Sequence, residues 1–203
     1  MTTPDHTILG ICGSPRKGSN SRIMLEAMLE GAREAGGQTE LVLLSDLAFS
    51  SCIGCEACRT AKECVGLDDD MTRLYPSIVD SRGLALVSPT HNYNVTALMK
   101  SFIDRLYCFY DFTDDHPRGY TSRLAGRGRV AAAAAVCEQT DPSDMGWTIE
   151  AMTRPIEVLG YEIAGDVRAF GVFEAGGIKK QPDVLDRCRE LGRTMAEKIV
   201  SGG

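Results

Sequence analysis

The chain has 203 residues, of which 43% are hydrophobic, and a net charge of -6. This length fits one domain whose core needs no disulfides. The acidic balance argues against nucleic-acid binding, which requires a basic surface. Residues 1–6 lack the basic and apolar regions of a signal peptide, and no window approaches the roughly 20 apolar residues of a membrane span. We therefore expect a cytoplasmic protein with no membrane partner.

Short apolar runs alternate with helical patterns along the whole chain. Strands are predicted at 7–12, 39–44, 83–87, 130–136 and 161–169. Helices are predicted at about 21–35, from Asp69 or Asp70 onward, and at about 96–109, 145–159 and 182–200. This alternation predicts an α/β fold, a three-layer doubly wound five-stranded parallel sheet of flavodoxin-like strand order 2-1-3-4-5, as a single domain over 1–203.

Two features interrupt the regular pattern. Pro155 is expected to kink or interrupt the helix at 145–159, because proline lacks the N–H of a helical hydrogen bond. Residues 111–128 form a long stretch without a pattern, rich in Asp, Arg and Gly. Because this stretch exceeds the usual length of a connection, it is expected to be a functional lid or interface loop, or a disordered segment.

The loop after the first strand has the composition of an anion site. It reads Gly13-Ser-Pro-Arg-Lys-Gly-Ser-Asn-Ser21 and leads directly into a helix, whose first N–H groups are free to bind a phosphate. Ser19-Asn20 stands where a Walker A loop needs Lys-Ser/Thr, and the Gly-x-Gly-x-x-Gly of a dinucleotide site is missing. The loop therefore favours a terminal phosphate such as that of FMN, and the alternative is a polar turn with a helix cap.

The loop after the third strand should face the same ligand. In a doubly wound sheet, ligands bind beyond the carboxyl ends of the strands where the strand order reverses. The loop reads Ser88-Pro-Thr-His-Asn-Tyr-Asn-Val95. Its backbone can hydrogen-bond a ring edge, and Tyr93 or His91 can pack against a flat heterocycle.

Half of the eight cysteines lie close together as Cys-x2-Cys-x2-Cys-x5-Cys, at Cys52, Cys55, Cys58 and Cys64. Clustered thiols in a reducing compartment indicate metal or redox chemistry. A two-cluster ferredoxin is excluded by the last spacing and by Val65, and zinc usually takes two separated pairs. A single [4Fe-4S] cluster, metal-free thiols and zinc remain open. The other cysteines, Cys12, Cys108, Cys137 and Cys188, are expected to be core or surface thiols.

Three segments together resemble the NADPH-dependent FMN reductase family of flavodoxin-like proteins. They are the loops at 13–21 and 88–94 and the run Met99-Lys-Ser-Phe-Ile-Asp-Arg105, and the resemblance covers about residues 7–170. With the cysteine-rich loop at 51–66 included, the chain is most similar to the iron-sulfur flavoprotein branch, whose members carry compact four-cysteine motifs. The resemblance implies a flavin-dependent oxidoreductase linked to NAD(P)H or ferredoxin.

The resemblance also implies roles for single residues. The FMN phosphate is expected at Ser14, Arg16, Ser19, Asn20 and Ser21. The isoalloxazine ring is expected at Pro89, Thr90, His91, Asn92, Tyr93 and Asn94, with Cys137 in a loop along the pyrimidine edge, and the cluster at Cys52, Cys55, Cys58 and Cys64. His91 stands where relatives often have Tyr, so it can hydrogen-bond the flavin, stack on it or only close the loop. Lys100, Asp104 and Arg105 are expected to be structural or to contact a second subunit.

The sequence thus favours an electron-transfer flavoprotein with an FMN and an adjoining cysteine loop as an accessory electron port. Electrons would pass between a reduced donor and a small-molecule or protein acceptor, and no acid-base residue is assigned. One alternative is a cluster-free NAD(P)H-dependent FMN or quinone reductase, in which Arg118, Arg123 and Arg127 meet the cofactor phosphate or stay solvated. The other is a non-enzymatic flavodoxin-like module with structural zinc. A homodimer or homotetramer is expected from the family.

Overall fold

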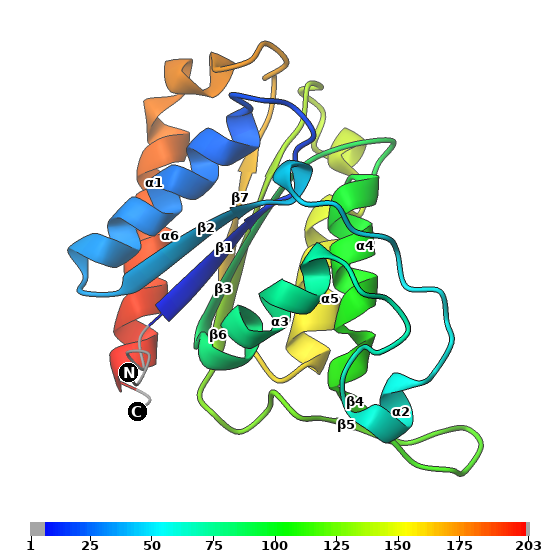
Figure 1. The fold of residues 1–203 in the computed structure, drawn as a ribbon. Coiled ribbons are helices and arrows are strands. Elements are labelled where there is room, and N and C mark those ends of the chain that lie inside the picture. The colour runs from blue at the N-terminus through cyan, green and yellow to red at the C-terminus, as the bar shows by residue number, and fades with distance from the viewer. Residues whose placement is uncertain (1–6, 202–203) are drawn as a thin grey trace.

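The computed structural model describes residues 7–201, and the predicted absence of a signal peptide in residues 1–6 falls outside them. Its centre is a parallel sheet of five strands in the order β2-β1-β3-β6-β7 (Figure 1). The strands are β1 (Thr7–Cys12), β2 (Gln38–Leu43), β3 (Gly83–Pro89), β6 (Val130–Val136) and β7 (Glu162–Ala169). Apart from numbering, this is the predicted strand order, and the flavodoxin-like fold is confirmed.

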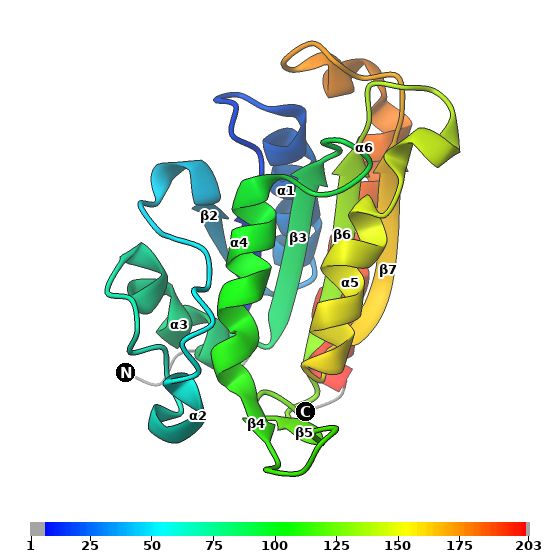
Figure 2. The same cartoon turned by 90° about the vertical axis from the view of Figure 1, so that its right-hand side faces the viewer.

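Helices cover both faces of the sheet, as Figures 1 and 2 show. One face carries α1 (Asn20–Glu34) and α6 (Pro182–Ser201), and the other carries α3 (Asp70–Asp80), α4 (Ala97–Arg105) and α5 (Thr148–Val158). The central strands alternate between the two resulting cores: Leu84 and Leu86 pack into one, and Ala85 and Val87 into the other. Burial on both faces explains why these strands read as continuous apolar runs.

The stretch at 111–128 is not structureless, which corrects the expectation from the sequence. It contributes to an antiparallel hairpin of β4 (Tyr110–Phe112) and β5 (Tyr120–Ser122). Tyr107 stacks on Phe112 with ring centroids 5.0 Å apart, and Tyr120 meets Tyr110 edge to face at 5.7 Å. Aromatic contacts of this kind stabilise a short hairpin that has no apolar run of its own.

Pro155 does not interrupt its helix, so of the two predicted effects, a kink or an interruption, the second does not occur. It lies inside α5, which is continuous from Thr148 to Val158. The proline removes one donor only, while Ile149, Met152 and Ile156 bury the apolar face of the helix against the sheet. Tertiary packing therefore outweighs the missing hydrogen bond.

Short helical pieces lie in the connections: α2 (Cys58–Ala61), and the 3-10 turns at Leu44–Asp46, Leu106–Phe109, Pro142–Met145 and Gly177–Lys180. The helix predicted at 96–109 therefore ends as an α-helix at Arg105 and continues as a 3-10 turn. Within residues 7–201, no helix has the length and apolar character that crossing a membrane requires.

Candidate functional site

A pocket of 230 Å³ lies at the carboxyl ends of β1 and β3. It brings together most of the residues predicted to hold the flavin. The predicted residues that line it are Ser14, Arg16, Ser19, Asn20, Ser21, Pro89, Thr90 and His91. This is the edge of the sheet at which the strand order reverses, so the two loops meet where a doubly wound fold binds its ligand.

The serine hydroxyls of the first loop differ in their hydrogen-bond partners. The Oγ of Ser19 caps α1 by accepting a hydrogen bond from the N–H of Arg22 at 3.2 Å, and the Oγ of Ser14 accepts one from the N–H of Arg16 at 3.3 Å. Ser21 is buried, and within residues 7–201 its Oγ has no hydrogen-bond partner. Because a buried hydroxyl without a partner is costly, the Oγ of Ser21 fits a site that holds a polar ligand.

Two residues of the first loop brace the segment that follows β7. The side-chain amide of Asn20 donates to the carbonyl of Glu174 at 2.9 Å and accepts from the N–H of Ile178 at 3.2 Å. Arg16 donates to the carbonyl of Phe173 at 3.2 Å, and its guanidinium stands 4.8 Å from the centre of the Phe173 ring. Their first role is therefore to hold a third loop over the pocket.

The second loop turns sharply at its tip. His91 and Asn94 pair backbone to backbone at 2.8 and 3.1 Å, while Asn92 and Tyr93 have φ angles of 47° and 63°. His91 lines the pocket; Asn92, Tyr93 and Asn94 do not. The carbonyl of Tyr93 accepts from the N–H of Trp147 at 2.8 Å, which ties the tip to the loop after β6.

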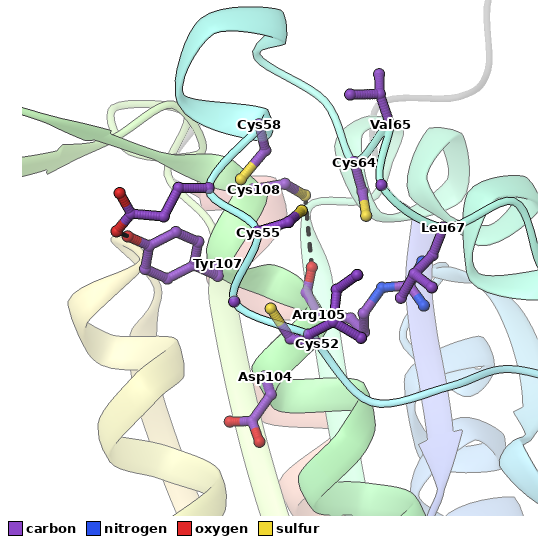
Figure 3. Close-up of a pocket in the computed structure, with 14 residues that line it drawn as sticks. Cys52, Cys55, Cys58, Cys64, Val65, Leu67, Asp104, Arg105, Tyr107 and Cys108 are labelled. Carbon is purple, nitrogen blue, oxygen red and sulfur yellow. Dashed lines mark hydrogen bonds between the residues drawn. The ribbon is translucent and has the colours of Figure 1, made fainter.

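The cysteines line a second pocket, of 350 Å³, shown in Figure 3. Cys52, Cys55, Cys58 and Cys64 all contribute to its wall. In Figure 3 their sulfur atoms face the space between the cysteine loop and the end of α4, where Asp104, Arg105, Tyr107 and Cys108 complete the lining. Within residues 7–201, no three His, Cys, Asp or Glu side chains are grouped tightly enough to hold one metal ion.

The two pockets stand at opposite ends of α4. Thr96, which caps the start of α4, donates a hydrogen bond to Gly13 in the loop after β1, whereas Arg105 at the end of α4 lines the cysteine pocket. Nine helical residues span about 14 Å at 1.5 Å per residue. Of the described residues, none lines both pockets. Within one chain, the cysteine pocket therefore lies at the opposite end of α4 from the first pocket. The start of the cysteine loop passes along α4, where the Oγ atoms of Ser51 and Ser101 are 2.7 Å apart.

Comparison with known proteins identifies the family. Residues 6–143 match the family model for NADPH-dependent FMN reductase. The chain belongs to this family. An iron-sulfur flavoprotein of Archaeoglobus fulgidus is 32% identical over 197 residues, covering 95% of this chain and 80% of that protein. Another, from Methanocaldococcus jannaschii, is 27% identical over 199 residues, covering 95% of this chain and 96% of its own.

A solved structure of another protein has the same fold as this chain. It is an FMN-dependent NADH-azoreductase of Bacillus anthracis in complex with FMN, with a TM-score of 0.69, 18% identity, and coverage of 94% of this chain and 99% of that chain. The predicted family and its iron-sulfur flavoprotein branch are confirmed. The protein is a flavin-dependent oxidoreductase.

Some pocket residues of this family member were missed by sequence reasoning. Val172 and Phe173 line the first pocket and were not predicted. In the loop predicted to lie along the pyrimidine edge, Glu138 lines the pocket, whereas Cys137 packs into the core. The signal lay in the topology, because the loops after the last two parallel strands open at the same edge of the sheet as those after β1 and β3. Cys108, expected to be a core or surface thiol, is buried in the core and also lines the cysteine pocket.

Burial and the neighbouring cysteines raise the pKa of two thiols in the cysteine pocket, those of Cys58 and Cys108. Burial raises the pKa of Cys58, and the neighbouring Cys64, Cys52 and Cys55 raise it further. Burial and the nearby Cys64 raise the pKa of Cys108 to about 12. Several thiolates in one apolar pocket repel one another unless a cation is present, which is the situation that a bound metal group relieves. The donor set therefore fits an iron-sulfur cluster.

Charged side chains between residues 99 and 128 form ion pairs and hydrogen bonds with other residues of the same chain. Arg118 pairs with Glu56 at 2.9 Å, Arg123 donates to the carbonyl of Cys108, and Arg127 donates to the carbonyl of Val79 at 2.8 Å. None of the three lines the first pocket. Lys100 and Asp104 form an exposed ion pair at 2.5 Å along α4, as their helical spacing predicts.

Proposed function

We propose that this protein binds FMN in the first pocket and a [4Fe-4S] cluster in the second, and transfers electrons between a reduced donor and a small-molecule or protein acceptor. NAD(P)H or a reduced ferredoxin is the proposed donor. The observation that carries the proposal is that Cys52, Cys55, Cys58 and Cys64 line one pocket of a flavin-dependent oxidoreductase. The names of the similar iron-sulfur flavoproteins agree with it.

The first pocket suits the phosphate end of FMN. The Oγ of Ser21, which has no partner within residues 7–201, the positive end of the α1 dipole and the nearby Arg16 supply a donor and positive charge for a phosphate. Thr90 and His91 then lie where the flavin ring begins. Bound FMN supplies hydride and single-electron chemistry, and the chain contributes binding and orientation.

The second pocket suits a cluster better than a single zinc ion. In a [4Fe-4S] cluster each of the four cysteines binds a different iron atom, so the sulfur atoms stand farther apart than the four ligands of a tetrahedral zinc ion. The four thiols come from one compact loop and line one pocket, whereas a structural zinc site usually takes two separated cysteine pairs. Such a cluster supplies one-electron transfer, and the exposed Cys52 and Cys55 leave it open to a redox partner.

The test is the composition of protein purified without oxygen. Flavin, iron, zinc and acid-labile sulfide are measured on one sample, together with its visible spectrum. Flavin with iron and sulfide supports the proposal. Flavin without metal would instead indicate a cluster-free NAD(P)H-dependent FMN or quinone reductase, and zinc in the cysteine pocket would refute the cluster.

A further inference from the structure

The two ends of the cysteine loop meet at one guanidinium group. Ser50 precedes the four cysteines and Asp69 follows them. The Nη1 of Arg105 donates to the carbonyl oxygen of Ser50 at 2.9 Å and to Oδ2 of Asp69 at 2.7 Å, and its Nη2 donates to Oδ1 of Asp69 at 3.0 Å. A residue of α4 thus closes the loop without using any of the thiols.

Further hydrogen bonds join the same two ends directly. The N–H of Ser50 donates to Oδ2 of Asp69 at 3.1 Å. The N–H of Ala48 donates to Oδ2 of Asp70 at 2.7 Å, and the N–H of Asp70 donates to the carbonyl of Ala48 at 3.2 Å. Each of these hydrogen bonds requires residues 48–50 and residues 69–70 to stay side by side. Arg105 holds them there by bonding to both ends.

The hydrogen bonds between Arg105, Ser50 and Asp69 are shielded from water. The Arg105 side chain is 1% exposed and that of Asp69 is 14% exposed. The Nε of Arg105 donates to the hydroxyl of Tyr75 at 3.1 Å, so each of the three guanidinium nitrogens has a hydrogen-bond partner. Only a planar fork makes these bonds at once, and a lysine ammonium does not.

We propose that Arg105 is a positioning residue for the metal group: by closing the loop between Ser50 and Asp69, it holds the four thiols at one pocket before a metal binds. The part of this proposal that concerns metal binding rests on the proposed function, in which the pocket lined by Arg105 and the four cysteines holds a metal group. The part that concerns closure of the loop does not depend on the proposed function. Preorganising ligands in this way removes the entropy cost of gathering them during binding.

The first test uses the metal-free, FMN-loaded protein. Arg105→Lys keeps the charge but lacks the fork, and Arg105→Met with Asp69→Asn removes both charges while keeping an N-cap for α3. Hydrogen exchange is followed at the amides of Ala48, Asp70 and Lys62, whose acceptors are intact in both variants. We expect exchange at least about tenfold faster than in the unmodified protein. Arg73→Met, which removes an exposed pair with Asp70 at 2.8 Å, should change it little.

The second test adds iron and sulfide and measures how fast a chelator removes the iron. Both Arg105 variants should retain FMN, because their change lies at the far end of α4, but they should lose iron at least about tenfold faster. Unchanged amide exchange overturns the loop closure. Faster exchange with unchanged iron loss overturns the positioning role. If the unmodified protein takes up no iron, the proposed function fails, while the exchange result still decides whether Arg105 closes the loop.

Discussion

Thr96 joins the two loops that meet at the first pocket: its Oγ1 donates a hydrogen bond to the carbonyl oxygen of Gly13 at 2.6 Å. The same Oγ1 accepts from the N–H of Met99 at 3.1 Å and so caps α4, and the N–H of Thr96 donates to the Oγ of Ser88 at 3.3 Å. One buried residue therefore fixes the phosphate loop, the loop after β3 and the start of α4 relative to one another.

Replacing Thr96 by valine keeps the shape and removes the hydroxyl. We expect a loss of about 1–2 kcal/mol in unfolding free energy, since a helix cap and a buried hydrogen bond disappear together. FMN binding should weaken several-fold, because Gly13 is released. Urea unfolding and flavin titration measure the two effects, and Thr96→Ser should behave like the unmodified protein. A valine variant with unchanged stability and affinity would show that this contact is not needed.

Ser21→Ala tests the phosphate site with little structural disturbance. The Oγ of Ser21 has no partner within residues 7–201, so its removal should leave the unfolding free energy nearly unchanged. Loss of a hydrogen bond to a charged phosphate should weaken FMN binding by about 1.5–3 kcal/mol. Ser81→Ala is the matched control, because Ser81 is equally buried but binds the carbonyl of Ile78. Equal FMN affinity in the two variants would contradict the assignment.

Gly146 allows the loop after β6 to lie against the tip of the flavin loop. Its φ is 56°, and a Cβ there would collide with the carbonyl oxygen of Tyr93. Gly146→Ala should cost more than the roughly 1–3 kcal/mol of backbone strain alone. Gly126→Ala measures that strain by itself, because φ is 81° and the space is open. Chemical unfolding of both variants gives the difference, which should vanish if the Tyr93 contact is unimportant.

The Asp69–Arg105 pair makes stability depend on acid pH. Burial acts to raise the pKa of Asp69, but hydrogen bonds from Arg105 and from the N–H of Ser50 outweigh it and hold the pKa below its usual value. The stabilisation is complete above the unfolded pKa of about 3.9, and is lost as the pH falls through the lower folded value.

Asp69→Asn should remove this dependence. The variant leaves Arg105 buried without its counter-charge, so we expect a loss of about 3–5 kcal/mol at pH 7. Below about pH 4 its stability should fall less steeply than that of the unmodified protein. Urea unfolding between pH 2.5 and 7, a range set about the carboxyl pKa, measures both. Parallel curves for the two proteins would argue against a charged Asp69 in the fold.

The parts of the fold that follow from local patterns were predictable. The runs at 83–87 and 130–136 are apolar because both faces of β3 and β6 are covered, and the loop at 13–21 carries its own helix cap in Ser19. These signals lie within a few residues of the feature they specify. They sufficed to predict the strand order and the meeting of the loops after β1 and β3 at one pocket.

Features that depend on distant contacts were not predictable. Cys108 reaches the cysteine pocket only because α4 ends at Arg105 and a 3-10 turn follows. The hairpin at 110–122 is stabilised by aromatic contacts such as Tyr107 with Phe112, not by an alternating pattern. The separation of the two pockets along α4 could not be predicted either, because it depends on the path of residues 45–69 in three dimensions.

The most direct test of the central claim is low-temperature electron paramagnetic resonance of the protein after chemical reduction without oxygen. A reduced [4Fe-4S] cluster is paramagnetic and its signal is distinct from that of a flavin radical. We expect the cluster signal in the unmodified protein and in Cys108→Ala, and its loss in Cys64→Ser, although both residues line the same pocket. The absence of a cluster signal in the unmodified protein, or its persistence in Cys64→Ser, would contradict this account.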